Sequence, residues 1–229
     1  MTDVAGSRVA LYWAPALDDP LHRLGSQWLG RDAETGASLD QPSVAGVDLR
    51  EVTRDARKYG LHATLKPPFR LAHGWAALRD DAARLAARTR PFELPPLALH
   101  SIDGFLALRE SVPCPALQAF ADACVEALDR HRAPPSEAEI ARRRPERLTE
   151  RQREHLNHWG YPYVFDTFFF HVTLTRRLTA DEDAVMRPAV LDWLGDAPAR
   201  SRRVTALCLF TQAQPDEPFL IAERLPLTG

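Results

Sequence analysis

Lysine is nearly absent from this 229-residue chain, and neither sign of charge is in clear excess. The 29 basic residues comprise 27 arginines and two lysines, Lys58 and Lys66, against 31 acidic residues, so the formal net charge is −2. General binding to nucleic acids or other polyanions needs clustered positive charge that neutralises phosphates. The near balance therefore argues against a general polyanion-binding protein. Both lysines lie four residues from one histidine, His62.

Cysteines and long apolar runs are also scarce. The three cysteines, Cys114, Cys124 and Cys208, are an odd number and form no CxxC pair. With no secretory apolar segment at the start of the sequence, they favour reduced thiols in a cytoplasmic protein. No apolar stretch reaches a dozen residues, so none is long enough to span a bilayer. The 45% hydrophobic and 26% charged content is typical of a soluble globular protein.

Strand and helix signals alternate along the chain. Asp18 or Asp19 is the candidate N-cap of the first helix and Thr179 that of the last. Pro67 and Pro68 are expected to end the strand that begins at residue 61. Helices are predicted at residues 20–29, 48–59, 74–90, 116–130, 136–158 (in two pieces) and 180–194, and strands at residues 8–15, 61–65, 92–100, 105–108, 164–174, 204–211 and 219–224.

The order of these elements repeats. A strand, a helix and a pair of strands follow His62, and the same order follows His171. We therefore expect an α+β fold of two pseudo-symmetric lobes, each a mainly antiparallel sheet with outer helices, facing a central cleft. The chain is predicted to be a single bilobal domain (1–229), with approximate lobes at 1–112 and 113–229 between which strands can exchange.

The repeat contains one short sequence match, His-Ala-Thr-Leu at residues 62–65 and His-Val-Thr-Leu at residues 171–174. Strand side chains alternate between faces, so His62, Thr64 and Lys66 are predicted to share one face. By the same alternation His171, Thr173 and Thr175 share a face. A run of polar side chains on an inner strand is costly unless it lines a wet cleft.

Paired histidines in such a cleft suit phosphodiester chemistry. Imidazole changes charge near neutral pH, so one ring can deprotonate water while the other protonates the leaving alkoxide. Threonine hydroxyls two residues away can donate to the phosphoryl oxygens as negative charge develops. No metal or other cofactor is required by this scheme. One such tetrapeptide is a weak signal, whereas two in matching positions of a repeat favour catalysis.

The paired motifs resemble those of the two-histidine (2H) phosphoesterase superfamily, whose members carry two H-x-[ST]-apolar motifs across a cleft. More narrowly, the chain is similar to the uncharacterised DUF1045 family, which is linked by name to phosphonate metabolism. The stretches that carry the resemblance are LYWAP at residues 11–15, WLGRDAETG at 28–36, YGLHATLKPPFRL at 59–71 and GYPYVFDTFFFHVTLT at 160–175.

The resemblance implies a cyclic phosphodiesterase acting on a small sugar or nucleotide cyclic phosphate. It implies that His62 and His171 are catalytic and that Thr64 and Thr173 bind phosphate. It also implies that Lys66 and Tyr12 line the site, for which Tyr163 and Thr175 are further candidates. One position departs from the family pattern, since Phe169 stands two residues before the second histidine, where arginine is common.

Several alternatives remain open at this level. The same motifs suit a phosphodiesterase or ligase that acts on RNA ends, or a sensor that binds a phosphorylated ligand without turnover. His155 and His158 are spaced as two metal ligands on one helix, although no third ligand is evident. Six arginines between residues 142 and 153 form either a solvated helix face or a rim that attracts anions, and residues 132–160 are a candidate lid.

Overall fold

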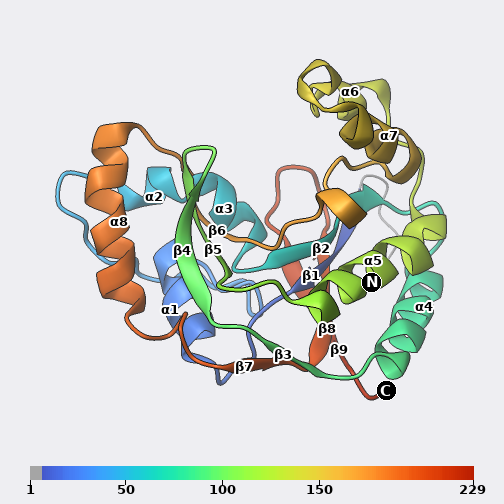
Figure 1. Cartoon of the computed structure of the whole chain (residues 1–229), viewed down its shortest axis with the longest axis horizontal. Helices are drawn as coiled ribbons and strands as arrows, with labels where there is room; N and C mark the ends of the chain where they lie inside the picture. The colour runs from blue at the N-terminus through green and yellow to red at the C-terminus, as the bar shows by residue number, and fades with distance from the viewer. Residues whose placement is uncertain (1–6) are drawn as a thin grey trace.

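The computed structural model describes residues 7–229, and in this part of the chain seven strands form one antiparallel sheet. Their order across the sheet is β4-β5-β6-β2-β1-β8-β9 (Figure 1). The strands are β1 (Arg8–Trp13), β2 (Ala63–Arg70), β4 (Leu97–Ile102), β5 (Phe105–Glu110), β6 (Val172–Arg177), β8 (Ala206–Gln212) and β9 (Leu220–Pro226). The predicted α+β class with an antiparallel sheet is confirmed.

Each half of the sequence contributes strands to both sides of this sheet. β4 and β5 from the first half lie beside β6, and β8 and β9 from the second half lie beside β1. The chain crosses between the sides through β3 (Phe92–Leu94) and β7 (Arg202–Val204), which pair antiparallel with each other. β3 and β7 occupy equivalent places in the repeated order of elements, so their pairing fits an approximate two-fold relation between the two halves of the chain. The division into lobes near residue 112 stays a prediction.

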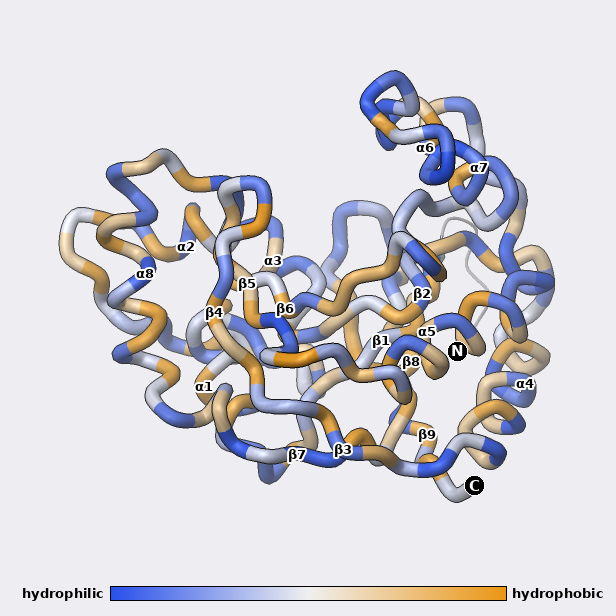
Figure 2. Tube along the Cα trace, in the orientation of Figure 1, coloured by the Kyte–Doolittle hydropathy of each residue, from blue (hydrophilic) through white to orange (hydrophobic). Residues whose placement is uncertain are grey.

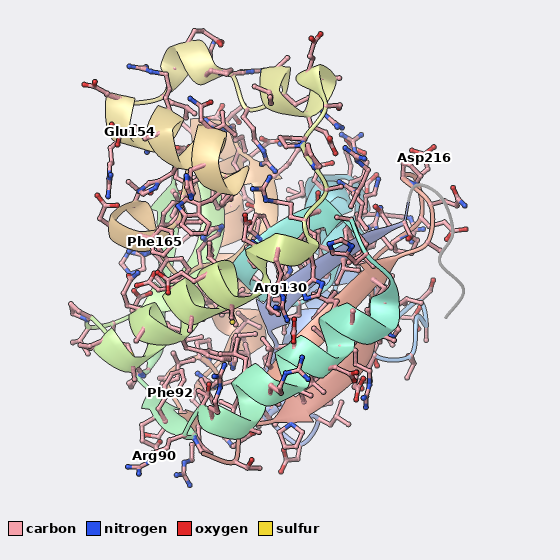
Figure 3. All side chains as sticks on the ribbon, turned by 90° about the vertical axis from the view of Figure 1, so that its right-hand side faces the viewer. Arg90, Phe92, Arg130, Glu154, Phe165 and Asp216 are labelled. Carbon is pink, nitrogen blue, oxygen red and sulfur yellow. The ribbon has the colours of Figure 1, made fainter. Side chains whose placement is uncertain are left out.

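The longer helices cover the sheet in two groups. α4 (Trp75–Arg88) and α5 (Pro115–Leu128) lie side by side, with α4 against β8 and β9 and α5 against β2 (Figure 3). α1 (Pro20–Leu29) packs against α8 (Ala180–Leu194), and α3 (Arg54–Tyr59) packs against β6. The short helix α2 (Leu49–Val52) precedes α3. Among residues 7–229 no helix combines the length and apolar character needed to cross a bilayer.

Local sequence explains where these helices begin and end. The Asp19 carboxylate caps α1 by accepting a hydrogen bond from the Leu21 amide, and Gly30 ends the helix in the left-handed region. Thr179 and Glu182 form a capping box at the start of α8. At the tip of the β4–β5 hairpin Asp103 and Gly104 both have positive φ, as a tight turn requires.

Residues 132–160 project above the β2 side of the sheet (Figure 1). They contain α6 (Glu137–Ala141) and α7 (Glu150–Trp159), so the predicted helix in two pieces is confirmed. The segment is mainly hydrophilic, in contrast to the apolar strands of the sheet (Figure 2). Its action as a lid remains a prediction.

Two strand predictions are wrong. β2 continues through Pro67 and Pro68, because these residues fall at a register shift against β1 and because β6 pairs with β2 only at Ala63. No ladder hydrogen bond is therefore lost at the prolines. The strand predicted at residues 164–174 starts only at Val172, because residues 165–167 form a 3₁₀ turn.

Candidate active site

The two motif histidines immediately precede the residues at which β2 and β6 pair. Ala63 lies directly opposite Val172. Extending this antiparallel register by one residue places His62 opposite Thr173 and Thr64 opposite His171. Ala63 and Val172 are fully buried, whereas the four polar residues are only partly buried. Directly opposed side chains in a sheet have Cβ atoms about 5 Å apart, so the register alone gathers two imidazoles and two hydroxyls on one face.

These four side chains line a common cavity of about 250 Å³. A cavity of this size lies below the usual range for drug-sized ligands, which favours a small ligand. Tyr12 and Thr175 also line it. The remaining lining residues are Arg8, Asp55, Ala56, Tyr59, Pro67, Pro68, Arg143 and Tyr161.

Both imidazoles are oriented in the same way. Nδ1 of His62 lies 2.8 Å from the Gly60 carbonyl oxygen, and Nδ1 of His171 lies 3.1 Å from the carbonyl oxygen of Phe169. In each case the acceptor is two residues earlier in the chain. A carbonyl can only accept, so Nδ1 carries the proton and the Nε2 lone pair of the neutral ring is left available. Each ring therefore presents a base or, after protonation, an acid.

An aromatic ring stacks on each of the two imidazoles. Tyr12 stacks on His62 with ring centroids 4.0 Å apart, and Phe169 stacks on His171 at 4.7 Å. Phe169, two residues before the second histidine, thus contributes both its ring and its carbonyl to the orientation of His171. Arg109 of the neighbouring strand β5 lies over the outer face of the Phe169 ring, at 5.9 Å from its centroid.

Both histidines favour the neutral form. Burial lowers the pKa of His62 to about 4, with the hydrogen bond to Gly60 opposing the shift and the charge of His171 adding to it. Burial also lowers the pKa of His171, opposed by the hydrogen bond to Phe169 and assisted by Arg109. At neutral pH each ring is therefore ready to accept a proton at Nε2.

Lys66 does not lie on the histidine face, and that prediction is wrong. Tyr12 pairs with Thr64, but Leu11 pairs with Lys66, so Leu65 is an extra residue in a β-bulge. The bulge turns Lys66 to the face of the sheet that α5 covers. There Lys66 is 1% exposed, and Nζ donates to the Asp129 carboxylate at 2.8 Å and to the Val125 carbonyl at 3.3 Å.

The remaining predicted residues fall at different distances from the cavity. Tyr12 lines it, and Thr175 does so while its hydroxyl accepts a hydrogen bond from the Leu106 amide. Tyr163 does not line the cavity but packs edge-on against Tyr161 and Phe169, which places it behind the site. Thr175 thus lines the cavity while its hydroxyl is engaged by the backbone, and Tyr163 packs against residues that contact the site.

Sequence reasoning missed the rim of the cavity. Arg8 comes from the start of β1, Tyr59 from the end of α3 and Arg143 from the segment after α6. Arg8 and Arg143 belong to no motif, so only the fold brings them to the histidines, whereas Tyr59 opens the stretch at residues 59–71 that carries the family resemblance. The arginine-rich run at residues 142–153 gave a partial signal, because it was a candidate rim.

His155 and His158 do not form a metal centre with a third ligand. His155 is buried and its Nε2 lies 2.6 Å from the Asp166 carboxylate, while the His158 ring packs against Trp159. Within residues 7–229 no group of three or more histidine, cysteine, aspartate or glutamate side chains is placed to hold a metal ion. The pair is better explained by packing of α7 against the turn at residues 165–167.

Gly60 is expected to be required for the placement of His62. It has φ 80° and ψ 179°, a conformation that favours glycine, and an added Cβ would lie 2.5 Å from the Cβ of Ala33. Gly60→Ala should destabilise the protein by on the order of 1–3 kcal/mol and lower kcat/KM about tenfold by shifting the carbonyl that orients the imidazole. Thermal unfolding and steady-state kinetics measure both effects. Gly46→Ala is the control, because Gly46 also has positive φ but has open space around it; equal effects of the two variants would contradict the prediction.

The family assignment made from the motifs is confirmed. The family model described as "Protein of unknown function (DUF1045)" matches residues 64–220, and the chain belongs to this family. The chain is 35% identical over 232 residues to the ribose 1,5-bisphosphate phosphokinase PhnN of Janthinobacterium sp. (strain Marseille), covering 97% of this chain and 51% of that protein. It is 36% identical over 216 residues to the protein of the same name from Laribacter hongkongensis (strain HLHK9), covering 90% and 48%. The chain thus spans about half the length of these curated relatives.

Solved structures share a partial likeness with the whole chain. E. coli LigT complexed with 3′-AMP has 16% sequence identity and a TM-score of 0.49, over 97% of this chain and 99% of LigT. A structure described as a phosphoesterase has 15% identity and a TM-score of 0.47, over 98% and 99%. At these levels of similarity, function has to be argued from the site of this chain.

Proposed function

We propose that the protein is a metal-independent phosphodiesterase that opens a small cyclic phosphate by two-histidine acid–base catalysis. The observation that carries the proposal is the matched pair of imidazoles. His62 and His171 line one cavity, and each donates from Nδ1 to the carbonyl two residues before it. Thr64 and Thr173 stand on the opposing strand beside them. This arrangement matches what the 2H phosphoesterase motifs imply.

In the proposed reaction one histidine removes a proton from water at Nε2. The resulting hydroxide attacks phosphorus, and the bond to one ring oxygen breaks. The second histidine gives its Nε2 proton to the departing alkoxide, so the product is a phosphomonoester with a free hydroxyl. Each proton transfer contributes on the order of 10²–10⁴ to the rate, and the threonine hydroxyls donate to the non-bridging oxygens as charge develops.

Either histidine can act as the base, and the choice of hydroxyl freed in the product assigns the two roles. Burial lowers the pKa of both rings, that of His62 to about 4, so both rings are neutral in the free protein at pH 7.

The substrate is proposed to be a sugar or nucleotide cyclic phosphate in the cytoplasm. The cavity is small, and Tyr59 and Tyr161 offer partly exposed rings that can pack on a sugar. The relatives named after a ribose bisphosphate kinase favour a pentose phosphate. The kinase activity itself is not proposed for this chain, because a P-loop lysine is followed by serine or threonine, whereas Lys58 is followed by tyrosine and Lys66 by proline.

A screen of cyclic phosphates tests the proposal. The purified protein is incubated with 2′,3′-cyclic nucleotides, a 1″,2″-cyclic phosphate, ribose cyclic phosphates and an RNA that ends in a 2′,3′-cyclic phosphate. Phosphate is measured after a coupled phosphatase releases it from the product. Turnover of one of these substrate classes, with activity retained in the presence of EDTA, supports the proposal. Ligand-induced thermal stabilisation without turnover would instead indicate a sensor, and activity restricted to RNA ends would indicate the RNA-directed alternative.

The maximum of kcat/KM is expected at a pH below 6.5. Burial holds the pKa of both histidines below 6.5, and the active form needs one neutral and one protonated ring. As the pH falls toward about 4 both rings become protonated and the base is lost, and as the pH rises toward neutrality both rings become neutral and the acid is lost. Rates measured from pH 3.5 to 8.5 provide the profile; a maximum above pH 7 would contradict the expected protonation states.

A further inference from the structure

A second cavity, of about 210 Å³, adjoins the histidine cavity. Arg8, Tyr59, Pro68 and Arg143 line both, so the two cavities are continuous. The second cavity extends away from the histidines, between the far end of β2 and the segment that contains α6. A ligand whose phosphate lies between the histidines can therefore reach this cavity with another of its groups.

The second cavity is strongly positive. Five arginines but a single carboxylate line it: Arg8, Arg70, Arg132, Arg142, Arg143 and Glu139. Arg70 is paired with Glu139 at 3.1 Å, and Arg132 with Asp129 at 2.8 Å. Arg8 and Arg143, which stand where the cavities join, have no carboxylate within 4.0 Å among residues 7–229. Of the three lining arginines without a carboxylate partner in the described part of the chain, two thus stand at the junction, and the third, Arg142, donates to the Ala138 carbonyl.

Both junction arginines are held in place by neutral groups. Nε of Arg8 donates to the Gln212 side chain at 2.8 Å, and its guanidinium lies over the Phe219 ring. The Arg143 guanidinium lies over the Tyr161 ring, 4.8 Å from its centroid. Aromatic faces orient a guanidinium while leaving N–H groups free to donate. The two side chains are therefore oriented for an anion without being neutralised by the protein.

We propose that this junction binds a second phosphate group of the substrate, so that the preferred substrate is a cyclic phosphate that also carries a phosphomonoester. The inference rests on the proposed function and names its substrate class. A cyclic phosphodiester has one negative charge and already meets two histidines and two threonines. Two further guanidinium groups supply more positive charge than that single negative charge requires. A phosphomonoester dianion matches both their charge and their forked hydrogen-bond donors.

The test compares paired substrates that differ by one phosphate. Adenosine 2′,3′-cyclic phosphate and ribose 1,2-cyclic phosphate are each measured with and without a 5′- or 5-phosphate. We expect kcat/KM for the phosphorylated member to be at least tenfold higher in one pair, because charge-assisted hydrogen bonds to a phosphate of this kind contribute ten- to hundredfold. The preference should fall as NaCl is raised, since the attraction is screened.

Arg143→Gln should reduce this preference at least tenfold. Arg147→Gln is the matched control, because Arg147 carries the same charge in the same segment, is exposed and lines neither cavity. A preference below threefold in both pairs, or an equal loss for both members of a pair in Arg143→Gln, overturns the inference. The second result would place Arg143 on the scissile phosphate.

Binding separates failure of this inference from failure of the proposed function. The Kd of each pair member is measured by calorimetry with His62→Ala protein. Selective binding of the phosphorylated member without turnover by the wild type would support the anion site and refute the phosphodiesterase. Turnover by the wild type without any preference for the phosphorylated member would support the phosphodiesterase and refute the anion site.

Discussion

Replacement of His62 or His171 by alanine is expected to lower kcat for the cyclic phosphate at least a hundredfold. Each imidazole supplies one proton transfer, and such a transfer contributes on the order of 10²–10⁴ to the rate. The double variant should be little slower than either single variant, because the base and the acid act in one step and their effects are not additive. EDTA should leave the wild-type rate unchanged.

His100→Ala is the control for this experiment. His100 is an exposed residue of β4 that does not line the cavity. Circular dichroism and thermal unfolding establish that the variants fold. Wild-type turnover in a folded His62→Ala or His171→Ala protein, or complete inhibition by the chelator, would falsify the two-histidine mechanism.

Asp129→Asn is expected to destabilise the protein by about 3 kcal/mol, which corresponds to roughly 6–12 °C in Tm. The substitution leaves the Lys66 ammonium buried beneath α5 with only the Val125 carbonyl and a neutral amide as acceptors. Burial lowers the pKa of Lys66, and the hydrogen bond to Asp129 opposes that shift in the wild type. Without the carboxylate the cost of burying the charge is no longer offset.

The destabilisation should depend on pH in a defined direction. Burial alone would raise the pKa of Asp129, but hydrogen bonds from Arg132 and Lys66 hold it below its ordinary value. The stabilising effect of the Asp129 carboxylate is therefore present above about pH 4 and is lost as the pH falls through its folded-state pKa. Urea unfolding at pH 7 and pH 3 measures the difference between wild type and variant.

Two further variants make this prediction specific. Asp80→Asn, at an exposed residue of α4, should change stability by less than about 0.5 kcal/mol. Lys66→Met should retain kcat/KM within about threefold, because Lys66 lies on the face of the sheet away from the histidines. A large loss of kcat/KM in folded Lys66→Met would contradict this placement and restore the role in lining the site that the family resemblance implied.

The position of Lys66 shows where strand alternation fails to predict the face on which a side chain lies. Counting by two from His62 reaches Thr64 correctly, and Thr64 faces the cavity. The bulge at Leu65 then inserts one residue, so Lys66 turns to the opposite face, and a second register shift follows before Phe69. A bulge depends on how two strands that are distant in the sequence pair, and no pattern within residues 61–70 predicts it. The same pairing explains why Pro67 and Pro68 are tolerated inside the strand.

Helix ends and turns were predicted more reliably because they depend on neighbouring residues. A carboxylate at residue 19 caps the amide of Leu21 two residues on, and the glycine at residue 30 accepts a left-handed conformation without strain. These interactions form within a single turn of chain. The strand predicted at residues 164–174 shows the limit of composition, since its aromatic first part forms a 3₁₀ turn and an irregular segment that packs around His171, and the strand begins only at Val172.

By itself the sequence determined the family, the helix boundaries and the two histidines with their threonines, because motifs and caps are encoded in residues a few positions apart. Only the tertiary structure decided that His62 and His171 share one cavity, since this follows from the pairing of Ala63 with Val172 across the sheet. It also placed Lys66 beneath α5 in contact with Asp129, and Arg8 and Arg143 where the two cavities join. Side chains separated by more than a hundred residues come together only when strand register and chain crossings are fixed, and no local pattern encodes that register.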